Sequence, residues 1–137
     1  MSTFQVHILS AECPFYEGPC ESLIVPTLQG QYGILAHHSN MIGAVLPGCM
    51  SYKLPGQEAQ IAAVSEGLIK VENNDVMVLV DTIERPEEID ENRARRAADE
   101  AREIMLQKRS MREYRAAEAT MARAIGRLRV KRSQDEK

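Results

Sequence analysis

The sequence contains no tryptophan, and aromatic residues of all kinds make up only 4% of its 137 residues. Its hydrophobic core must therefore be built from leucine, isoleucine, valine and methionine. No apolar run approaches the roughly 20 residues that a membrane-spanning helix needs. The N-terminus also lacks the basic and then apolar pattern of a secretory signal. These absences predict a soluble, cytoplasmic protein whose link to a membrane would come through a partner.

Cysteine is also scarce. The chain has Cys13, Cys20 and Cys49, an odd number with no C-x-x-C pair. That pattern favours small buried apolar residues in a reducing compartment over a metal or redox site.

Charge is distributed unevenly along the chain. Residues 1–83 carry two lysines against eight acidic residues, a net charge of −6, whereas residues 84–137 carry fifteen basic and twelve acidic residues. The overall net charge of −3 argues against general nucleic-acid binding. The change in charge density predicts two parts of different architecture, which we divide into domains of residues 1–84 and 85–137.

The first part has the pattern of short strands separated by turns. Apolar and polar residues alternate, most strictly from Val76 to Val80, which is the period of a half-buried strand. Turn residues such as Pro55-Gly56 and Asn73-Asn74 separate neighbouring runs. We expect strands near residues 3–9, 21–27, 34–35, 41–46, 49–54, 57–64, 67–72 and 75–80, with a turn-rich patch over 13–19 and a tight hairpin or bulge at the paired glycines of 30–33. Strands at this spacing predict an antiparallel β-sandwich or a flattened barrel.

The second part predicts two helices. Pro86 ends the strand region, and Asp90 is the expected N-cap because its carboxylate can accept from unpaired backbone N–H groups. Alanines then recur at three- and four-residue spacing and form a narrow apolar stripe on a charged helix. The pattern breaks at Gln107–Arg112, where Ser110 suits a turn or a cap, and a second amphipathic helix follows. The expected fold is α+β: a sandwich followed by an antiparallel helical hairpin.

The alanine stripe has an energetic consequence. Small side chains let two helices approach closely but bury little apolar area, so the hairpin is only weakly stabilised. We therefore expect a hairpin that can come apart.

Several chemistries find no support. His37 and His38 are adjacent, so on a strand they point to opposite faces and share one metal ion poorly, and no carboxylate follows at ligand spacing. We therefore expect no metal site. No Ser-His-Asp order, phosphate-binding glycine loop or paired catalytic carboxylates stand out, so we expect no catalytic residues. The basic segment 127–132 lacks interleaved aromatics, which favours contact with acidic protein over nucleic acid.

Three motifs carry a resemblance to a known family. Gly30-Gln-Tyr-Gly-Ile-Leu-Ala-His-His38 resembles the pattern Gly-(Asp/Glu)-Leu-Gly-Ile-x-Pro-Gly-His of the epsilon subunit of F-type ATP synthases. Ser65-Glu-Gly-Leu-Ile-Lys-Val71 is similar to its Ser-Gly-Gly-x-x-x-Val hairpin, and Ile89-Asp-Glu-Asn-Arg-Ala94 fits its Ile/Leu-Asp-x-x-Arg-Ala motif. The resemblance covers essentially the whole chain.

The resemblance implies a function. The sandwich would bind the gamma subunit and the membrane ring of c subunits, and the hairpin would either fold onto the sandwich or extend into the alpha/beta catalytic head. Extended, it would block rotation in the hydrolysis direction. The subunit would couple proton-driven rotation to ATP synthesis without catalysing a reaction, on the cytoplasmic face of a bacterial membrane rather than in a chloroplast.

The resemblance also implies candidate site residues. In the family, ATP can bind as a regulatory ligand and hold the hairpin folded; no cofactor is required. Acids would accept from the adenine amino group and arginines would reach the phosphates. The corresponding ATP latch in this chain is Glu84, Ile89, Asp90, Arg93, Ala94, Arg123 and Arg127.

This chain departs from the family pattern at several positions. Gln31 and His38 lie in the loop that would face the c ring, where Gln31 replaces an acid. Glu66 replaces a glycine, and Glu100 stands where ATP-binding relatives have a further arginine. The alternative for the latch arginines is that they are solvated or contact acidic patches of the catalytic head.

Two other function classes stay open from the residues alone. One is a free-standing β-sandwich that binds a small molecule or a metal and carries a helical dimerisation arm. The other is a nucleic-acid adaptor that uses the basic hairpin.

Overall fold

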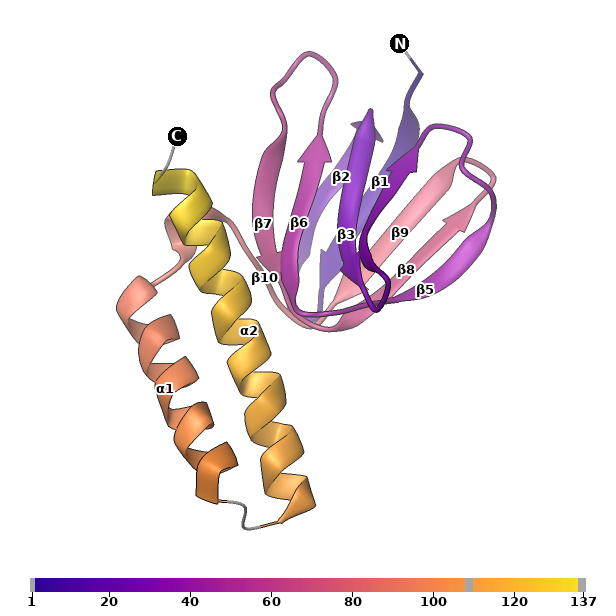
Figure 1. The fold of residues 1–137 in the computed structure, drawn as a ribbon. Coiled ribbons are helices and arrows are strands. Elements are labelled where there is room, and N and C mark those ends of the chain that lie inside the picture. Colours follow the sequence, from indigo (N-terminus) through magenta and orange to yellow (C-terminus); the bar gives the residue numbers. More distant parts are fainter. Residues whose placement is uncertain (1, 108–109, 136–137) are drawn as a thin grey trace.

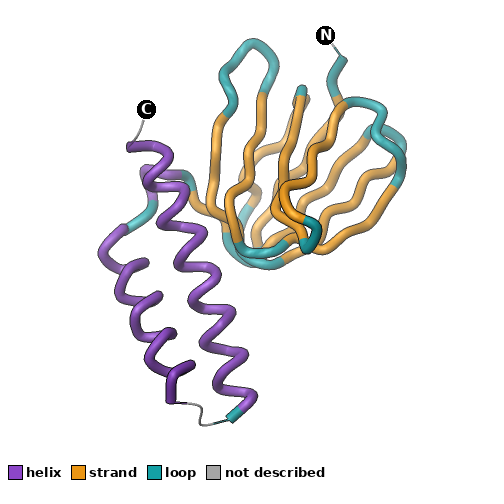
Figure 2. Tube along the Cα trace, viewed as in Figure 1, coloured by secondary structure: helices purple, strands orange, loops and turns teal. Residues whose placement is uncertain are grey.

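The computed structural model describes residues 2–107 and 110–135, which form a β-sandwich followed by two long helices (Figures 1 and 2). The predicted architecture is confirmed, and of the two expected forms of the β-region the structure is the sandwich. Its first sheet contains, in spatial order, β2 (Pro14–Cys20), β1 (Phe4–Ser10), β9 (Asp75–Val80), β8 (Gly67–Glu72) and β5 (Met41–Val45). Its second sheet contains β10 (Ile83–Glu84), β7 (Gln60–Val64), β6 (Gly48–Lys53), β3 (Ser22–Thr27) and β4 (Gly30–Leu35).

Two strands and one pairing differ from expectation. Residues 30–33, expected to form a tight hairpin or bulge, are part of β4 and pair with β3. The stretch expected to be turn-rich forms β2, which pairs antiparallel with β1. This strand lies at the edge of its sheet, where the missing N–H groups of Pro14 and Pro19 break no ladder on the outer side. Among the described strands, β1 and β9 are the pair that runs parallel, whereas the sandwich was expected to be antiparallel throughout.

The core lies between the two sheets and is mainly aliphatic. Alternate residues of each strand point inward, as in β9, where Val76, Val78 and Val80 are buried. The largest fully buried side chains include Phe4, Ile8, Leu23, Ile34, Met50 and Ile69. The low aromatic content of the sequence is thus compensated by branched aliphatic side chains.

The turns between strands follow their residue types. Asn73 and Asn74, between β8 and β9, have φ values of 51° and 63°, in the left-handed region that asparagine tolerates. Gly56 has φ 75° in the Pro55-Gly56 turn, which the hydrogen bond from Gln57 N to Leu54 O closes. Both expected turns are confirmed.

A short 3-10 helix, η1 (Pro86–Glu88), connects the sandwich to the hairpin of α1 (Glu91–Gln107) and α2 (Met111–Asp135). Asp90 caps α1 as expected: its Oδ1 accepts from Arg93 N at 3.1 Å. Ser110 caps α2 in the same way, since its Oγ accepts from Glu113 N at 3.1 Å. Residues 108 and 109 of the predicted break lie outside the described residues.

The two helices pack side by side through small residues, and α2 also lies against the sandwich (Figure 1). Ala94, Ala98 and Ala101 of α1 and Ala117 and Ala124 of α2 are buried. Each buried methyl group contributes about 0.8 kcal/mol at most. α2 contacts β6 and β7 of the second sheet, so the described helices leave the outer face of the first sheet uncovered. Within the described residues, neither helix is both long and apolar enough to cross a bilayer.

Gly67, at the start of β8, should be indispensable for folding. A β-carbon there would overlap the carbonyl oxygen of Leu79 and approach Val80 Cα to 2.6 Å. Because both obstacles are backbone, we expect Gly67→Ala to lower the free energy of unfolding by about 3 kcal/mol or more. Urea denaturation measures this, with Gly33→Ala as the control, since a β-carbon at Gly33 has no neighbour within 4 Å. Equal stability of the two variants would contradict the prediction.

Candidate functional site

The face of α2 that meets the sandwich is formed by residues at helical spacing. Arg123, Gly126, Arg127 and Val130 lie three, four and seven positions apart, so they share one side of the helix. Val130 is fully buried and packs with Ala63 and Ile89. The basic segment 127–132, for which the sequence favoured contact with acidic protein, is therefore part of the interface with the sandwich. The spacing of these residues was the signal that could have revealed it.

Backbone approaches backbone at the centre of this interface. A β-carbon added to Gly126 would lie 3.1 Å from Gly48 Cα and 3.2 Å from Gly48 N. Two glycines thus let α2 lie directly on the first residue of β6.

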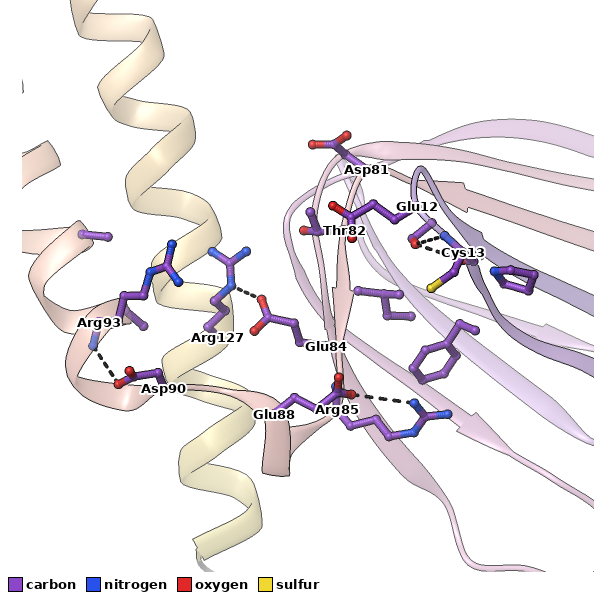
Figure 3. Close-up of a pocket in the computed structure, with 16 residues that line it drawn as sticks. Glu12, Cys13, Asp81, Thr82, Glu84, Arg85, Glu88, Asp90, Arg93 and Arg127 are labelled. Atoms are coloured by element: carbon purple, nitrogen blue, oxygen red, sulfur yellow. Dashed lines mark hydrogen bonds and ion pairs between the residues drawn. The ribbon is translucent and has the colours of Figure 1, made fainter.

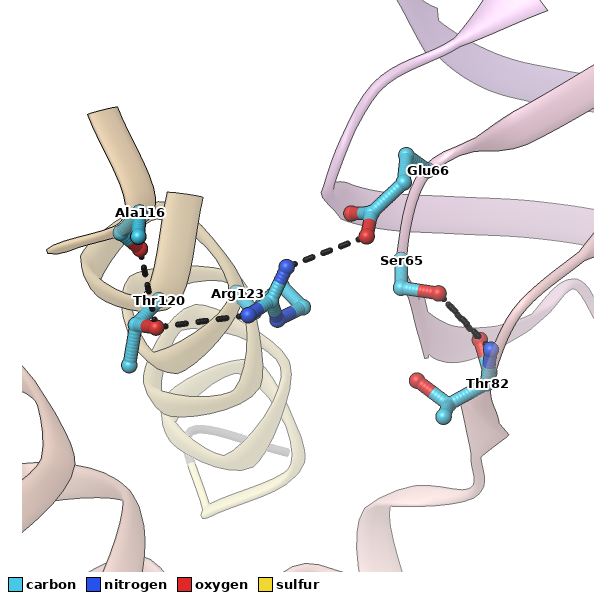
Figure 4. Close-up of polar contacts among 6 residues, drawn as sticks. All are labelled: Ser65, Glu66, Thr82, Ala116, Thr120 and Arg123. Atoms are coloured by element: carbon cyan, nitrogen blue, oxygen red, sulfur yellow. Dashed lines mark hydrogen bonds and ion pairs between the residues drawn. The ribbon is translucent and has the colours of Figure 1, made fainter. Parts of the chain in front are cut away.

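Each of the two arginines on this face pairs with a carboxylate of the sandwich. Arg127 Nε donates to Glu84 of β10, and both side chains are mostly shielded from solvent (Figure 3). Arg123 Nη1 lies 3.0 Å from Glu66 Oε1, in the connection between β7 and β8 (Figure 4). The pair with Glu66 is a contact that the sequence did not predict, because the two residues are 57 positions apart.

A cavity of about 690 Å³ opens between the sandwich, η1 and the start of α1 (Figure 3). It is lined by Ser10, Glu12, Cys13, Pro14, Phe15, Asp81, Thr82, Ile83, Glu84, Arg85, Glu88, Asp90, Arg93, Ala94, Ala97 and Arg127. Five of the seven predicted latch residues are among them. Of the other two, Ile89 is buried in the cluster beneath α2, and Arg123 lies beside a narrow cleft formed with Ser65 and Thr82.

The walls of this cavity carry more negative than positive charge. Five carboxylates face three guanidinium groups, and the acids contributed by the sandwich edge, Glu12 and Asp81, were not expected there. Arg85 is engaged by stacking at 4.1 Å on the Phe15 ring and by a 3.7 Å contact with Glu88. Among the described residues, Arg93 forms no ion pair, so its guanidinium is available to an anion.

Cys49 provides a native reporter of this interface. It is half-buried and packs against the cluster of Ala63, Ile89 and Val130 under α2. Burial raises the pKa of the Cys49 thiol, which lowers the fraction of reactive thiolate while the helix is docked. Cys13 is exposed and Cys20 is buried in the sandwich core, so the three thiols differ in accessibility.

The predicted c-ring residues lie at opposite ends of β4. Gln31 is exposed near its start, and His38 follows its end. His38 Nδ1 lies 2.8 Å from Ser39 O and Nε2 lies 3.1 Å from the Tyr32 hydroxyl. Because a carbonyl only accepts, Nδ1 carries the proton and Nε2 accepts from Tyr32. The ring is thus held in one orientation and one tautomer.

An apolar surface crosses the outer face of the first sheet. Strand register aligns Leu9, Leu79, Leu68 and Ala44 in one row over four strands. Met77 and Ile42 lie on the same face in the adjacent row, on either side of Lys70. We call these six residues the apolar face; Ile42 is 73% exposed and Leu68 is 55% exposed. Exposed apolar side chains gathered on one face of a sheet suit a protein-binding site.

The remaining polar clusters offer little for metal chemistry. His7 contacts Asp75 at 3.1 Å and Glu17 at 3.7 Å across three strands. In residues 2–107 and 110–135, no group of three or more His, Cys, Asp or Glu side chains is arranged to hold a metal ion.

Comparison with known families gives a match for each part of this architecture. The family described as "ATP synthase, Delta/Epsilon chain, beta-sandwich domain" matches residues 3–86. The family described as "ATP synthase, Delta/Epsilon chain, long alpha-helix domain" matches residues 87–132. The chain belongs to the delta/epsilon chain family of ATP synthases.

Curated relatives indicate the epsilon branch of this family. The ATP synthase epsilon chain of Caldanaerobacter subterraneus is 40% identical over 129 residues, which cover 93% of both chains. The epsilon chain of Ruminiclostridium cellulolyticum is 37% identical over 128 residues, covering 93% of this chain and 95% of the relative. The resemblance read from the three motifs is confirmed, and a free-standing binding protein is not favoured.

Solved structures share the fold. A chain of the Euglena gracilis mitochondrial ATP synthase superposes with a TM-score of 0.81 at 19% identity, covering 92% of this chain and 79% of that one. A chain from the central stalk and c ring of the Tetrahymena thermophila enzyme gives 0.66 at 10% identity, covering 93% and 95%. At these identities the likeness concerns the fold alone.

Substituting Gly126 should undock α2 without unfolding it. Alanine favours helix by about 1 kcal/mol whether or not α2 is docked, whereas its methyl group meets Gly48 only in the docked form. We expect Gly126→Ala to speed the alkylation of Cys49 severalfold, with helix content by circular dichroism retained. Arg129→Ala, at an exposed position of the same helix, is the control. If Cys49 reacts at the same rate in both variants, the glycine contact does not control docking.

Proposed function

We propose that the chain is a non-catalytic central-stalk subunit that couples proton-driven rotation to ATP synthesis and restrains ATP hydrolysis through its hairpin. The observation that carries the proposal is the two-part architecture of an epsilon-chain family member. The sandwich presents an apolar face for assembly, while the hairpin is attached mainly through one side of α2. A rigid part that binds and a weakly held part that can move suit a coupler with a brake.

The apolar face is the surface we assign to the gamma subunit. It lies on the sheet that α2 leaves uncovered, so a partner can bind there with the hairpin folded or extended. Its aliphatic side chains supply the contact area that a stable subunit interface requires.

The other partners follow from the remaining surfaces. Gln31 and the oriented His38 are proposed to contact the c-subunit ring, along β4. The charged hairpin, once released, is proposed to contact the alpha/beta catalytic head. The subunit would lie at the cytoplasmic face of a bacterial membrane as a peripheral component, held there by these partners.

The cavity supports a regulatory nucleotide site. Asp90 and Glu84 offer acceptors for an adenine amino group, and Arg93 offers an unpaired guanidinium for phosphate. The surrounding carboxylates oppose a triphosphate, and Glu100, where ATP-binding relatives would have an arginine, lies outside the cavity in a groove between α1 and α2. The chemistry therefore suits weak binding of ATP as a regulatory ligand, with no cofactor required.

A charge placed on the apolar face should prevent assembly with gamma. We expect Leu68→Glu to weaken binding to isolated gamma subunit by about 30-fold or more, because a carboxylate would be buried without a partner. Leu106→Glu, the same change at a more exposed position on the hairpin, is the control. Surface plasmon resonance with immobilised gamma measures both affinities. If both variants bind like the unmodified chain, gamma docks elsewhere.

Removal of the hairpin should release the brake. In the assembled enzyme, deletion of residues 88–137 is expected to raise ATP hydrolysis while ATP synthase still assembles through the sandwich. Hydrolysis rates and the subunit stoichiometry of purified complexes are measured together. Unchanged hydrolysis in a complete complex would remove the inhibitory role.

A further inference from the structure

Arg123 connects the mobile hairpin to the sandwich through a single carboxylate. Its Nη1 lies 3.0 Å from Glu66 Oε1, and the guanidinium side chain is 28% exposed while that of Glu66 is 50% exposed (Figure 4). The contact joins α2 to the connection between β7 and β8. It therefore exists only while the hairpin is folded.

Glu66 is held in place by its neighbours. Asp81 N donates to Glu66 O at 3.1 Å, and Thr82 N donates to Ser65 Oγ at 2.7 Å. Ser65 is buried, and Gly67 on the other side has no room for a side chain. The backbone at Glu66 is thus fixed on both sides, which places the start of its side chain toward α2.

Arg123 is oriented from the helix side as well. Its Nη2 donates to Thr120 Oγ1 at 3.3 Å, and Thr120 Oγ1 donates to Ala116 O at 3.1 Å, one turn earlier (Figure 4). Arg123 from α2 and Glu66 from the connection between β7 and β8 thus meet without any added ligand.

We propose that Glu66 is an internal anion for Arg123, which holds the hairpin folded in the absence of nucleotide and competes with phosphate for this arginine. The role of Glu66 in holding the hairpin folded rests on its contact with Arg123. The competition with phosphate rests on the proposed nucleotide site. Since Arg127 already pairs with Glu84, both sandwich-facing arginines of α2 are neutralised by the chain's own acids. A triphosphate must displace Glu66 to use Arg123, and the displaced carboxylate stays nearby as a like charge.

The effect on docking is measured without nucleotide. In the full chain, Cys49 alkylation reports opening of the interface, and the rate in the unmodified chain is the reference. Partly exposed ion pairs shift an equilibrium about two- to fivefold. We expect Glu66→Gln to raise the Cys49 rate by that factor and to reduce its dependence on salt.

Glu72→Gln is the matched control. Glu72 ends the strand that follows Glu66, its side chain is 54% exposed, and it pairs with Lys70 at 2.9 Å rather than with the hairpin. We expect the Cys49 rate to be unchanged in this variant. In a double-mutant cycle, Arg123→Gln should raise the Cys49 alkylation rate by a smaller factor in the Glu66→Gln background than in the unmodified chain. Equal Cys49 rates in Glu66→Gln and Glu72→Gln would overturn the role of Glu66 in holding the hairpin folded.

Competition with phosphate is measured by calorimetric titration. ATP, and inorganic tripolyphosphate as a probe without adenine, are titrated into the unmodified chain and into both variants. We expect Glu66→Gln to bind each about two- to fivefold more tightly, with Glu72→Gln unchanged. Equal affinities overturn the competition. If no variant binds either compound, both the competition and the proposed nucleotide site fail. The Cys49 rates then still decide whether Glu66 holds the hairpin folded.

Discussion

The arrangement of this molecule depends on the close approach of α2 to strands β6 and β7 of the second sheet. Gly126 and Gly48 remove the side chains that would keep helix and strand apart. Only at that short separation can Val130 enter the cluster beneath the helix while Arg123 and Arg127 reach acids of the sandwich. The contact is narrow, since α1 lies on the far side of α2 and contributes little to it. A narrow interface between two well-formed parts favours a two-state device over a rigid body.

The polar contacts at this interface supply orientation more than strength. Partly exposed ion pairs contribute little net free energy, because solvent screens them and ordering two long side chains costs entropy. What they fix is which face of α2 meets the sandwich. They also make the docked state responsive to ionic conditions, since any anion or acidic surface that engages these arginines draws the hairpin away from its carboxylates.

Much of the fold was predictable because its signals are local. Alternation in β9, the asparagine turn before it and the caps at Asp90 and Ser110 each depend on a few neighbouring residues. β2 was missed because prolines, which normally exclude a strand, are tolerated at a sheet edge. The motif from Ile89 to Ala94 lies where the sandwich meets the hairpin, but it could not reveal that Ile89 is buried beneath α2.

The candidate site was less predictable because its contacts are long-range. Glu66 and Arg123 are each unremarkable in sequence, and only the fold brings them to hydrogen-bond distance. The same holds for the acids at the edge of the sandwich that line the cavity. A local sequence pattern indicates which residues could bind a ligand. The sign of the charge around that ligand depends on which strands end beside it in the fold.

The parallel pairing of β1 with β9 has a consequence for how the protein is made. Val6 of β1 pairs with Val76 of β9, so the first sheet cannot be completed until nearly the whole sandwich has left the ribosome. Pairings this distant in sequence form slowly, because the chain loses the entropy of closing a long loop before it gains the contacts between the strands. The two helices follow β9 in the chain, so they are synthesised after the strands against which α2 packs.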